Sequence, residues 1–199
     1  TEKWNEELIW GNPVNTSAQL QQRILPCFKD KDWSHTSGPI PEVYPTFRMA
    51  ELFYSQNGVP IEEDVNYDHP HRYQVVTVGD DHTYYIKKGE RTAYLNLYRE
   101  PRFYAWMAFD GGDYGTKFAA GSPLKLEMRN SEMHGYNPSL FNRDHSVTGF
   151  LTQKFVDPVT EFYTAGGSTS GTSAPTILFR LAELYLNVAE CQAALGNTQ

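Results

Sequence analysis

The segment 179–196 has the periodicity of a helix, but its apolar residues cover two faces rather than one. The first apolar stripe consists of Leu181, Leu184, Tyr185, Val188, Cys191 and Leu195. The second is rich in small side chains and consists of Ala182, Leu186, Ala189 and Ala193. A helix that is apolar on two sides packs between other helices, as in stacked helical hairpins. We therefore expect a mainly α fold in which this helix has partners beyond the printed sequence.

Two further helices are expected near the amino terminus. A short one is predicted over 16–25, capped by Thr16 or Ser17 and ended by Pro26. Another is predicted from Thr46, whose hydroxyl can cap free amides, to Gly58. Segments 73–78 and 83–86 are rich in β-branched and aromatic residues, and we predict that they form the two strands of a small β-hairpin. The segment 103–109 is compatible with a strand or with a helical turn opened by Pro101.

Long stretches without periodicity separate these elements. Segments 27–44 and 110–146 are rich in glycine and proline and are expected to be long ordered loops. The segment 166–171 has the composition of a flexible Gly/Ser/Thr linker.

Charge and cysteine content exclude several classes of protein. The net charge is −7 and no basic stripe is present, which argues against a nucleic-acid partner. Cys27 and Cys191 are the only cysteines, so there is no disulfide framework or CxxC metal pair. We expect Cys191 to be a small buried side chain, with a bridge to Cys27 as an alternative. No apolar run approaches the ~20 residues of a membrane span, and the first residues do not look like a signal peptide.

Aromatic residues in expected loops are the features that bear on function. The chain has 13 Tyr, 11 Phe and 4 Trp. A flat ring can cover the C–H face of a sugar while polar side chains satisfy its hydroxyls. The candidate ligand-binding residues are Trp33, His35, Tyr44, Tyr67 and Tyr73. The alternative for each is a ring that pins a loop onto the core.

Evidence for catalysis or metal binding is weak. His69 and His71 near Asp68 could supply metal ligands, but no second ligand cluster accompanies them, and we predict no metal site. The acidic run at 62–64 has the character of a solvated loop rather than a poised pair of carboxylates. No GxSxG, HExxH or phosphate-binding Gly-Lys motif is present. We predict a protein without a cofactor that is not an enzyme.

Four blocks of sequence resemble the SusD/RagB family of outer-membrane nutrient-binding lipoproteins, in the family's order. The blocks are Pro45-Thr46 through Phe53 to Asn57-Gly58; Arg99-Glu-Pro-Arg-Phe-Tyr104; Thr148-Gly-Phe150 with Lys154-Phe155 and Asp157-Pro158; and Arg180 to Glu190 followed by Ala194-Leu-Gly196. Phe150 replaces the usual tyrosine and Cys191 a commoner alanine. In the family the Arg99 to Tyr104 block is structural, so we assign it no binding role.

The resemblance implies a TPR-like helical superhelix with residues 1–199 as a single domain truncated at both ends. It implies a surface-exposed lipoprotein of the outer membrane, attached through a lipid anchor that is absent from this fragment. Such a protein binds oligosaccharides or another nutrient, such as a peptide, without cleaving them. It delivers them to a TonB-dependent porin of the SusC type. In the family, aromatic side chains just before the Pro-Thr helix contact glycan, and Trp33 matches them by position. The alternatives are a TPR-type protein-interaction scaffold and, less favoured, a glycoside hydrolase.

Overall fold

The computed structural model describes residues 6–12, 17–26, 39–80, 85–118, 122–136, 145–156, 161–162, 169–170 and 176–197. The chain divides into two compact units. Unit 1 comprises Thr1–Gln19 and Thr172–Gln199, and unit 2 comprises Leu20–Gly171. Each unit is described by itself.

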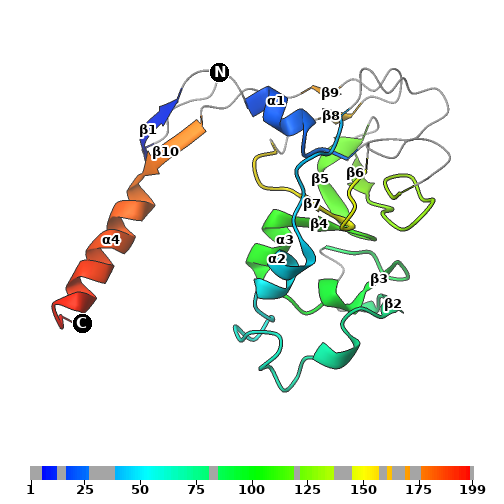
Figure 1. Cartoon of the computed structure of the whole chain (residues 1–199), viewed down its shortest axis with the longest axis horizontal. Helices are drawn as coiled ribbons and strands as arrows, with labels where there is room; N and C mark the ends of the chain where they lie inside the picture. The colour runs from blue at the N-terminus through cyan, green and yellow to red at the C-terminus, as the bar shows by residue number, and fades with distance from the viewer. Residues whose placement is uncertain are drawn as a thin grey trace. The chain divides into compact units, whose positions relative to one another are not determined.

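Unit 1 contains a two-stranded antiparallel sheet that leads into the longest helix (Figure 1). Strand β1 (Leu8–Asn12) pairs with β10 (Thr176–Arg180), and the rings of Trp10 and Phe179 stack at 5.9 Å. Helix α4 (Leu181–Ala194) follows directly, which confirms the predicted helix. It ends in a Schellman motif, because Gly196 has φ +78° and the amide of Asn197 donates to the carbonyl of Gln192 at 2.9 Å.

Both apolar stripes of α4 are exposed in the structure. Tyr185 on the first stripe is 69% exposed and Leu186 on the second is 68% exposed. Cys191 is an exposed free cysteine, so the expectation that it is buried or bridged to Cys27 is wrong. Helical periodicity showed which residues share a face, but it could not show what covers that face.

Unit 2 is built from short elements. Its helical segments are α1 (Ser17–Gln22, which begins in unit 1), α2 (Phe47–Leu52), α3 (Pro101–Trp106) and the 3-10 helices η1 (His69–His71) and η3 (Tyr94–Asn96). Its strands are β2 (Val75–Thr77), β3 (Arg91–Ala93), β4 (Met107–Phe109), β5 (Asp113–Phe118), β6 (Ser122–Lys125), β7 (Phe150–Thr152), β8 (Glu161–Phe162) and β9 (Thr169–Ser170). Two antiparallel pairs form, β2 with β3 and β4 with β7, and a four-stranded sheet has the order β6-β5-β8-β9 with β5 and β8 parallel.

Two buried clusters hold unit 2 together. The larger packs α2, α3 and the segments around η3, and its members include Ala50, Phe53, Ile61, Tyr67, Leu95 and Phe103. The smaller lies along β4 to β7 and consists of Leu25, Ala108, Tyr114, Leu124, Leu126, Met128 and Leu151. Both clusters join side chains from distant parts of the sequence, so short elements share a continuous apolar interior.

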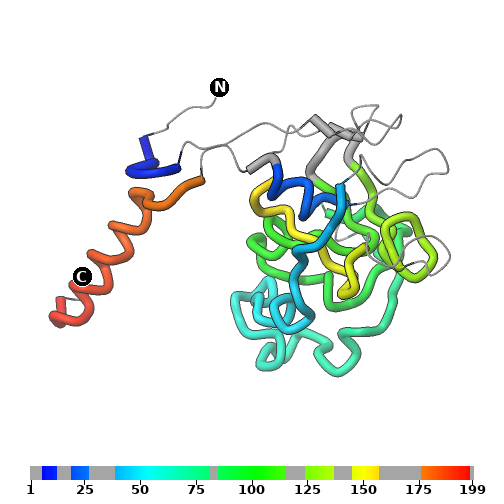
Figure 2. The backbone as a smooth tube through the Cα atoms, turned by 45° about the horizontal axis from the view of Figure 1, so that its top comes forward, coloured from blue at the N-terminus to red at the C-terminus, as the bar shows by residue number. Residues whose placement is uncertain are grey.

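The expected mainly α, TPR-like superhelix is wrong for the described part of the chain. Helices α1, α2 and α3 have six residues each, and only α4 reaches 14. Helix α2 begins as predicted, because the amide of Met49 donates to the hydroxyl of Thr46 at 3.2 Å. It ends at Leu52, six residues before the predicted end, and Phe53 is already extended. Gly58, with φ +73°, instead closes a tight turn in the loop after α2, which folds back so that Tyr54 pairs with Pro60 (Figure 2).

The predicted hairpin has a different partner strand. β2 lies in the predicted segment 73–78, but it pairs with β3, where Val76 faces Thr92. Residues 83–84 of the expected second strand lie outside the described residues, and Ile86 bridges to Gly112. The segment 103–109 contains both alternatives, the end of α3 and then β4. Of the predicted linker 166–171, only Thr169 and Ser170 are described, as β9, so the linker stays a prediction.

Candidate functional site

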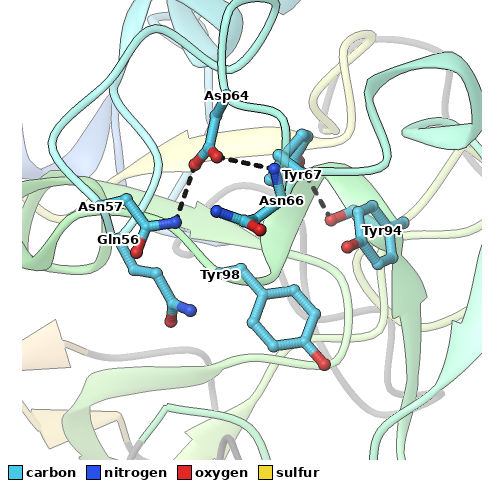
Figure 3. A pocket seen from close by; sticks show the side chains of 7 residues that line it. All are labelled: Gln56, Asn57, Asp64, Asn66, Tyr67, Tyr94 and Tyr98. Atoms are coloured by element: carbon cyan, nitrogen blue, oxygen red, sulfur yellow. Dashed lines mark hydrogen bonds between the residues drawn. The ribbon is translucent and has the colours of Figure 1, made fainter.

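A polar pocket of about 270 Å³ opens beside the loop that follows α2 (Figure 3). Its lining combines amides, one carboxylate and three phenol rings: Gln56, Asn57, Asp64, Asn66, Tyr67, Tyr94 and Tyr98. The first five come from the loop after α2, Tyr94 from η3, and Tyr98 from the bend between η3 and α3. We call this set the polar pocket.

Asp64 organises the floor of the polar pocket. Its carboxylate accepts a short hydrogen bond from the Ser55 hydroxyl, one from Asn57 Nδ2 at 3.0 Å, and one from the Asn66 amide at 2.9 Å. These donors, the Ser55 hydroxyl first, hold the pKa of Asp64 below its usual value. Both carboxylate oxygens are therefore engaged in shaping the loop.

Three tyrosine rings form one wall. The Tyr67 and Tyr94 rings lie 5.2 Å apart and the Tyr94 and Tyr98 rings 5.7 Å apart, each pair tilted. Tyr67 is buried, and its hydroxyl donates to the Tyr94 carbonyl at 3.3 Å. Burial raises the pKa of Tyr67, so its phenol stays neutral. The wall is apolar on its ring faces and also carries phenol hydroxyls.

Tyr98 has a left-handed backbone conformation, with φ +56°. This region is costly for a bulky side chain and persists only where the surroundings impose it. Here the amide of Gln56 donates to the Tyr98 carbonyl at 2.8 Å, and Ser55 pairs with Arg99 next to it. The loop after α2 therefore holds Tyr98 in the conformation that places it on the pocket wall.

Arg99 lies behind the wall and is almost fully buried. Its guanidinium donates to the carbonyls of Leu95, Ala50 and Phe53 at 2.6 to 2.7 Å and stacks 4.6 Å from the Phe103 ring. Burial lowers the pKa of Arg99, although nearby phenols oppose that shift. The expectation that this block is structural is confirmed. The same bonds explain why α2 can end at Leu52, since they satisfy carbonyls at its end.

The side-chain amides of Gln56 and Asn66 have no hydrogen-bond partner among the described residues, although both line the polar pocket. The hydroxyl of Tyr94 has none either. Asp64 is the only charged group among the lining residues that the structure describes. The polar pocket thus offers neutral donors and acceptors next to aromatic faces.

A second hollow, the apolar groove, has a volume of about 340 Å³. It is lined by Leu20, Ile24, Val43, Tyr44, Pro45, Met49, Trp106, Met107, Thr152, Lys154 and Phe155. The ammonium group of Lys154 lies 3.7 Å from the centre of the Trp106 ring. Its polar groups are few, and it lacks the amides that distinguish the polar pocket.

The structure places the predicted binding residues apart. Trp33 and His35 lie outside the described residues. Tyr44 is half-buried in the apolar groove, and Tyr67 lines the polar pocket. Tyr73 is 52% exposed and lines neither hollow; its hydroxyl donates to Glu51 Oε1 at 2.5 Å. The structure therefore does not bring Tyr44, Tyr67 and Tyr73 to one place.

Sequence analysis missed most of the polar pocket. Tyr94 and Tyr98 precede the Arg99 block, which is expected to be structural, and Gln56 and Asn57 precede Gly58, the expected end of a helix. Asn66 adjoins a residue that was singled out, Tyr67. The position of these residues next to a motif or a candidate residue is the one hint of the polar pocket that the sequence contains.

The described residues contain neither a cluster of potential metal ligands nor a helix that could span a membrane. Asp68 pairs with His71 at 2.8 Å, but no group of three potential metal ligands occurs among the residues described. Within the same residues, no helix is long and apolar enough to cross a bilayer.

Comparison with known proteins places the chain in a family. The family model described as "SusD family" matches residues 6–199. A solved structure of BT4246 is 59% identical, with a TM-score of 0.73 over 98% of this chain and 31% of that one. Its selenomethionine form is 58% identical, with a TM-score of 0.73 over 98% of this chain and 32% of that one.

A more distant relative shares the fold. A SusD-like protein (BF3747) from Bacteroides fragilis NCTC 9343 is 21% identical, with a TM-score of 0.62 over 98% of this chain and 34% of that one. No curated protein matches the chain. The chain spans about a third of the length of these solved relatives. Because the family match covers nearly every residue and agrees with the four sequence blocks, the chain belongs to the SusD family.

Proposed function

We propose that this chain is part of a cell-surface protein that binds oligosaccharides without cleaving them. Membership of the SusD family supports a role in glycan binding and nutrient uptake in general. The observation that carries the proposal is the polar pocket, where three tyrosine rings meet unpartnered amides in one hollow. Ring faces cover the C–H face of a sugar, and amides bond its hydroxyls.

The polar pocket supports binding better than hydrolysis. Glycosidases use two carboxyl groups across the scissile bond, and the acid among them has a raised pKa. Of the described residues that line the polar pocket, one carries a carboxylate, Asp64, and its three donors lower the pKa of that group. The group that would have to donate a proton is thus held in its ionised form.

The wider role follows from the family and is part of the proposal. The intact protein would lie on the outer face of the outer membrane, held by a lipid anchor, with residues 1–199 in a single domain. It would pass its ligand to a SusC-like TonB-dependent porin. Trp33, His35, Tyr44 and Tyr73 are proposed as further glycan contacts outside the polar pocket.

The proposal is tested by measuring binding of the chain to an array of neutral and acidic oligosaccharides, followed by calorimetry on the ligands found. Saturable binding with no new products after long incubation supports it. Cleavage products that disappear in an Asp64→Asn variant would instead establish a hydrolase. No binding to any oligosaccharide would favour a protein-interaction scaffold. Co-purification of the intact protein with a large outer-membrane barrel tests the transporter partnership.

A further inference from the structure

We infer that the polar pocket holds one neutral sugar residue of the glycan through the side-chain amides of Gln56 and Asn66. The inference rests on the proposed function and adds the site and the chemical class of ligand. It is carried by three properties of the polar pocket: its charge, its hydrogen-bonding groups and its size.

Charge excludes acidic sugars from the polar pocket. Among the described residues that line it there is no Lys, Arg or His, and the one charge among them is the carboxylate of Asp64. The guanidinium of Arg99, behind the tyrosine wall, lies 6.0 Å from the centre of the Tyr67 ring and donates to backbone carbonyls. A sugar carboxylate or sulfate would lose water, would meet no cation among the described lining residues, and would face the like charge of Asp64.

Hydrogen bonding favours hydroxyl groups. A carboxamide has two donors and an acceptor, so it can bond neighbouring hydroxyls of a sugar in both directions. The backbone amides of Gln56 and Asn66 are held by the Tyr98 carbonyl and by Asp64, while their side-chain amides have no partner among the residues described. Figure 3 shows both side chains among the residues that line the polar pocket. Gln56 and Asn66 thus have a backbone fixed by hydrogen bonds and a side-chain amide that is available to a ligand.

Size limits the ligand to one ring. A volume of about 270 Å³ lies just below the range of pockets that enclose drug-sized molecules, ~300 to 1,000 Å³. Gln56, Asn57 and Asn66 are exposed at the mouth, so the remainder of a glycan can leave the pocket into solvent. One residue would be held in the polar pocket, and its neighbours would lie outside.

The test uses the full chain and an array of oligosaccharides that end in a neutral hexose or N-acetylhexosamine, each printed beside its sulfated counterpart. Calorimetry then compares wild type with Gln56→Ala, Asn66→Ala and the double variant. Gln74→Ala is the matched control, because Gln74 is exposed and does not line the polar pocket. Melting temperatures are measured for all variants.

We expect each single variant to lose roughly tenfold in affinity, since each removes a hydrogen bond to the ligand, with an unchanged melting temperature. Gln74→Ala should bind as wild type does, and each sulfated counterpart should bind roughly tenfold more weakly or worse.

The binding measurements distinguish an error in the assignment of the polar pocket from an error in the proposed function. If wild type binds a neutral glycan and the double variant binds it equally well, the assignment of the polar pocket is overturned and the proposed function stands. If sulfated counterparts bind as tightly as neutral ones and depend on the same two amides, the ligand class is overturned. If wild type binds nothing on the array, the proposed function is overturned together with the inference.

Discussion

The guanidinium of Arg99 donates a hydrogen bond to the backbone carbonyl of Ala50 at 2.6 Å, although 49 residues separate them. This bond ties the bend that carries Tyr98 to the last turn of α2. Further bonds from the same group to Leu95 and Phe53 make Arg99 the junction of three segments around the polar pocket. A buried cation that is balanced by carbonyls rather than by a carboxylate makes several structural bonds at once.

Replacing Arg99 with Gln should lower the free energy of unfolding by about 2 to 4 kcal/mol. The shorter side chain cannot reach all of these carbonyls, so buried acceptors lose their partners. Urea denaturation measures the loss. Arg102→Gln is the control, because the Arg102 side chain is 55% exposed and makes an exposed ion pair with Glu100 rather than buried bonds to carbonyls, so its loss should stay within about 0.5 kcal/mol. Similar losses for the two variants would contradict the junction role.

Tyr98→Gly should give a more stable chain than Tyr98→Ala, by about 1 kcal/mol. At φ +56° glycine is unstrained, whereas alanine keeps the clash of its Cβ with the backbone. Both variants remove the ring, so the difference between their free energies of unfolding, measured by urea denaturation, reports the cost of the backbone conformation. At Arg48, an exposed position in α2, the order should reverse, because glycine is unfavourable inside a helix. If the alanine variant is more stable than the glycine variant at position 98 as well as at position 48, the backbone of Tyr98 is not strained.

Tyr73→Phe should reduce the loss of stability in acid. The hydroxyl of Tyr73, helped by Arg72, holds the pKa of Glu51 below its ordinary value of 4.5. The folded chain therefore binds fewer protons than the unfolded chain, so this contribution is present above pH 4.5 and is lost as the pH falls through the folded pKa. Without the hydroxyl, the pKa of Glu51 moves up toward 4.5 and less stability depends on pH.

A carbon-13 NMR titration of the Glu51 carboxyl, together with urea unfolding between about pH 5 and pH 3, measures both effects. Tyr54→Phe is the control, because Tyr54 is exposed and its hydroxyl does not contact Glu51. An unchanged Glu51 titration in Tyr73→Phe would show that the bond does not form in solution.

Gly135→Ala should be more destabilising than Gly58→Ala, by about 2 kcal/mol. A Cβ at Gly135 would lie 1.8 Å from the carbonyl oxygen of Arg129, so the backbone itself would have to move. A Cβ at Gly58 meets open space, and only its positive φ of 73° carries a cost, about 1 kcal/mol. Thermal unfolding of the two variants compares them directly. Equal melting temperatures would mean that the turn around Gly135 is wider than described.

Local features of the fold could be predicted from the sequence. Thr46 caps α2 and Gly196 ends α4, because both effects depend on atoms within a few residues. The family could also be identified, since its blocks are contiguous stretches of sequence. Features of this kind need no knowledge of distant contacts.

The fold class and the polar pocket could not be predicted because both depend on distant contacts. Helix α2 ends early because the guanidinium of Arg99 donates to carbonyls at its end. The periodicity of the helix contains no information about this distant donor. β2 pairs with β3 instead of the nearer segment. Within the polar pocket, Tyr98 lies 42 residues after Gln56 in sequence, yet their backbones are hydrogen-bonded at 2.8 Å.

The buried position of Arg99 also bears on the thermodynamics of recognition. The anchored backbone of the polar pocket means that a ligand meets walls already in their final places, so little conformational entropy is lost on association. Free and occupied forms should then superpose closely. If the polar pocket binds a sugar as proposed, its selectivity would come from the fit of the ligand to this anchored backbone, and adjustment would fall to exposed side chains such as Gln56 and Asn66.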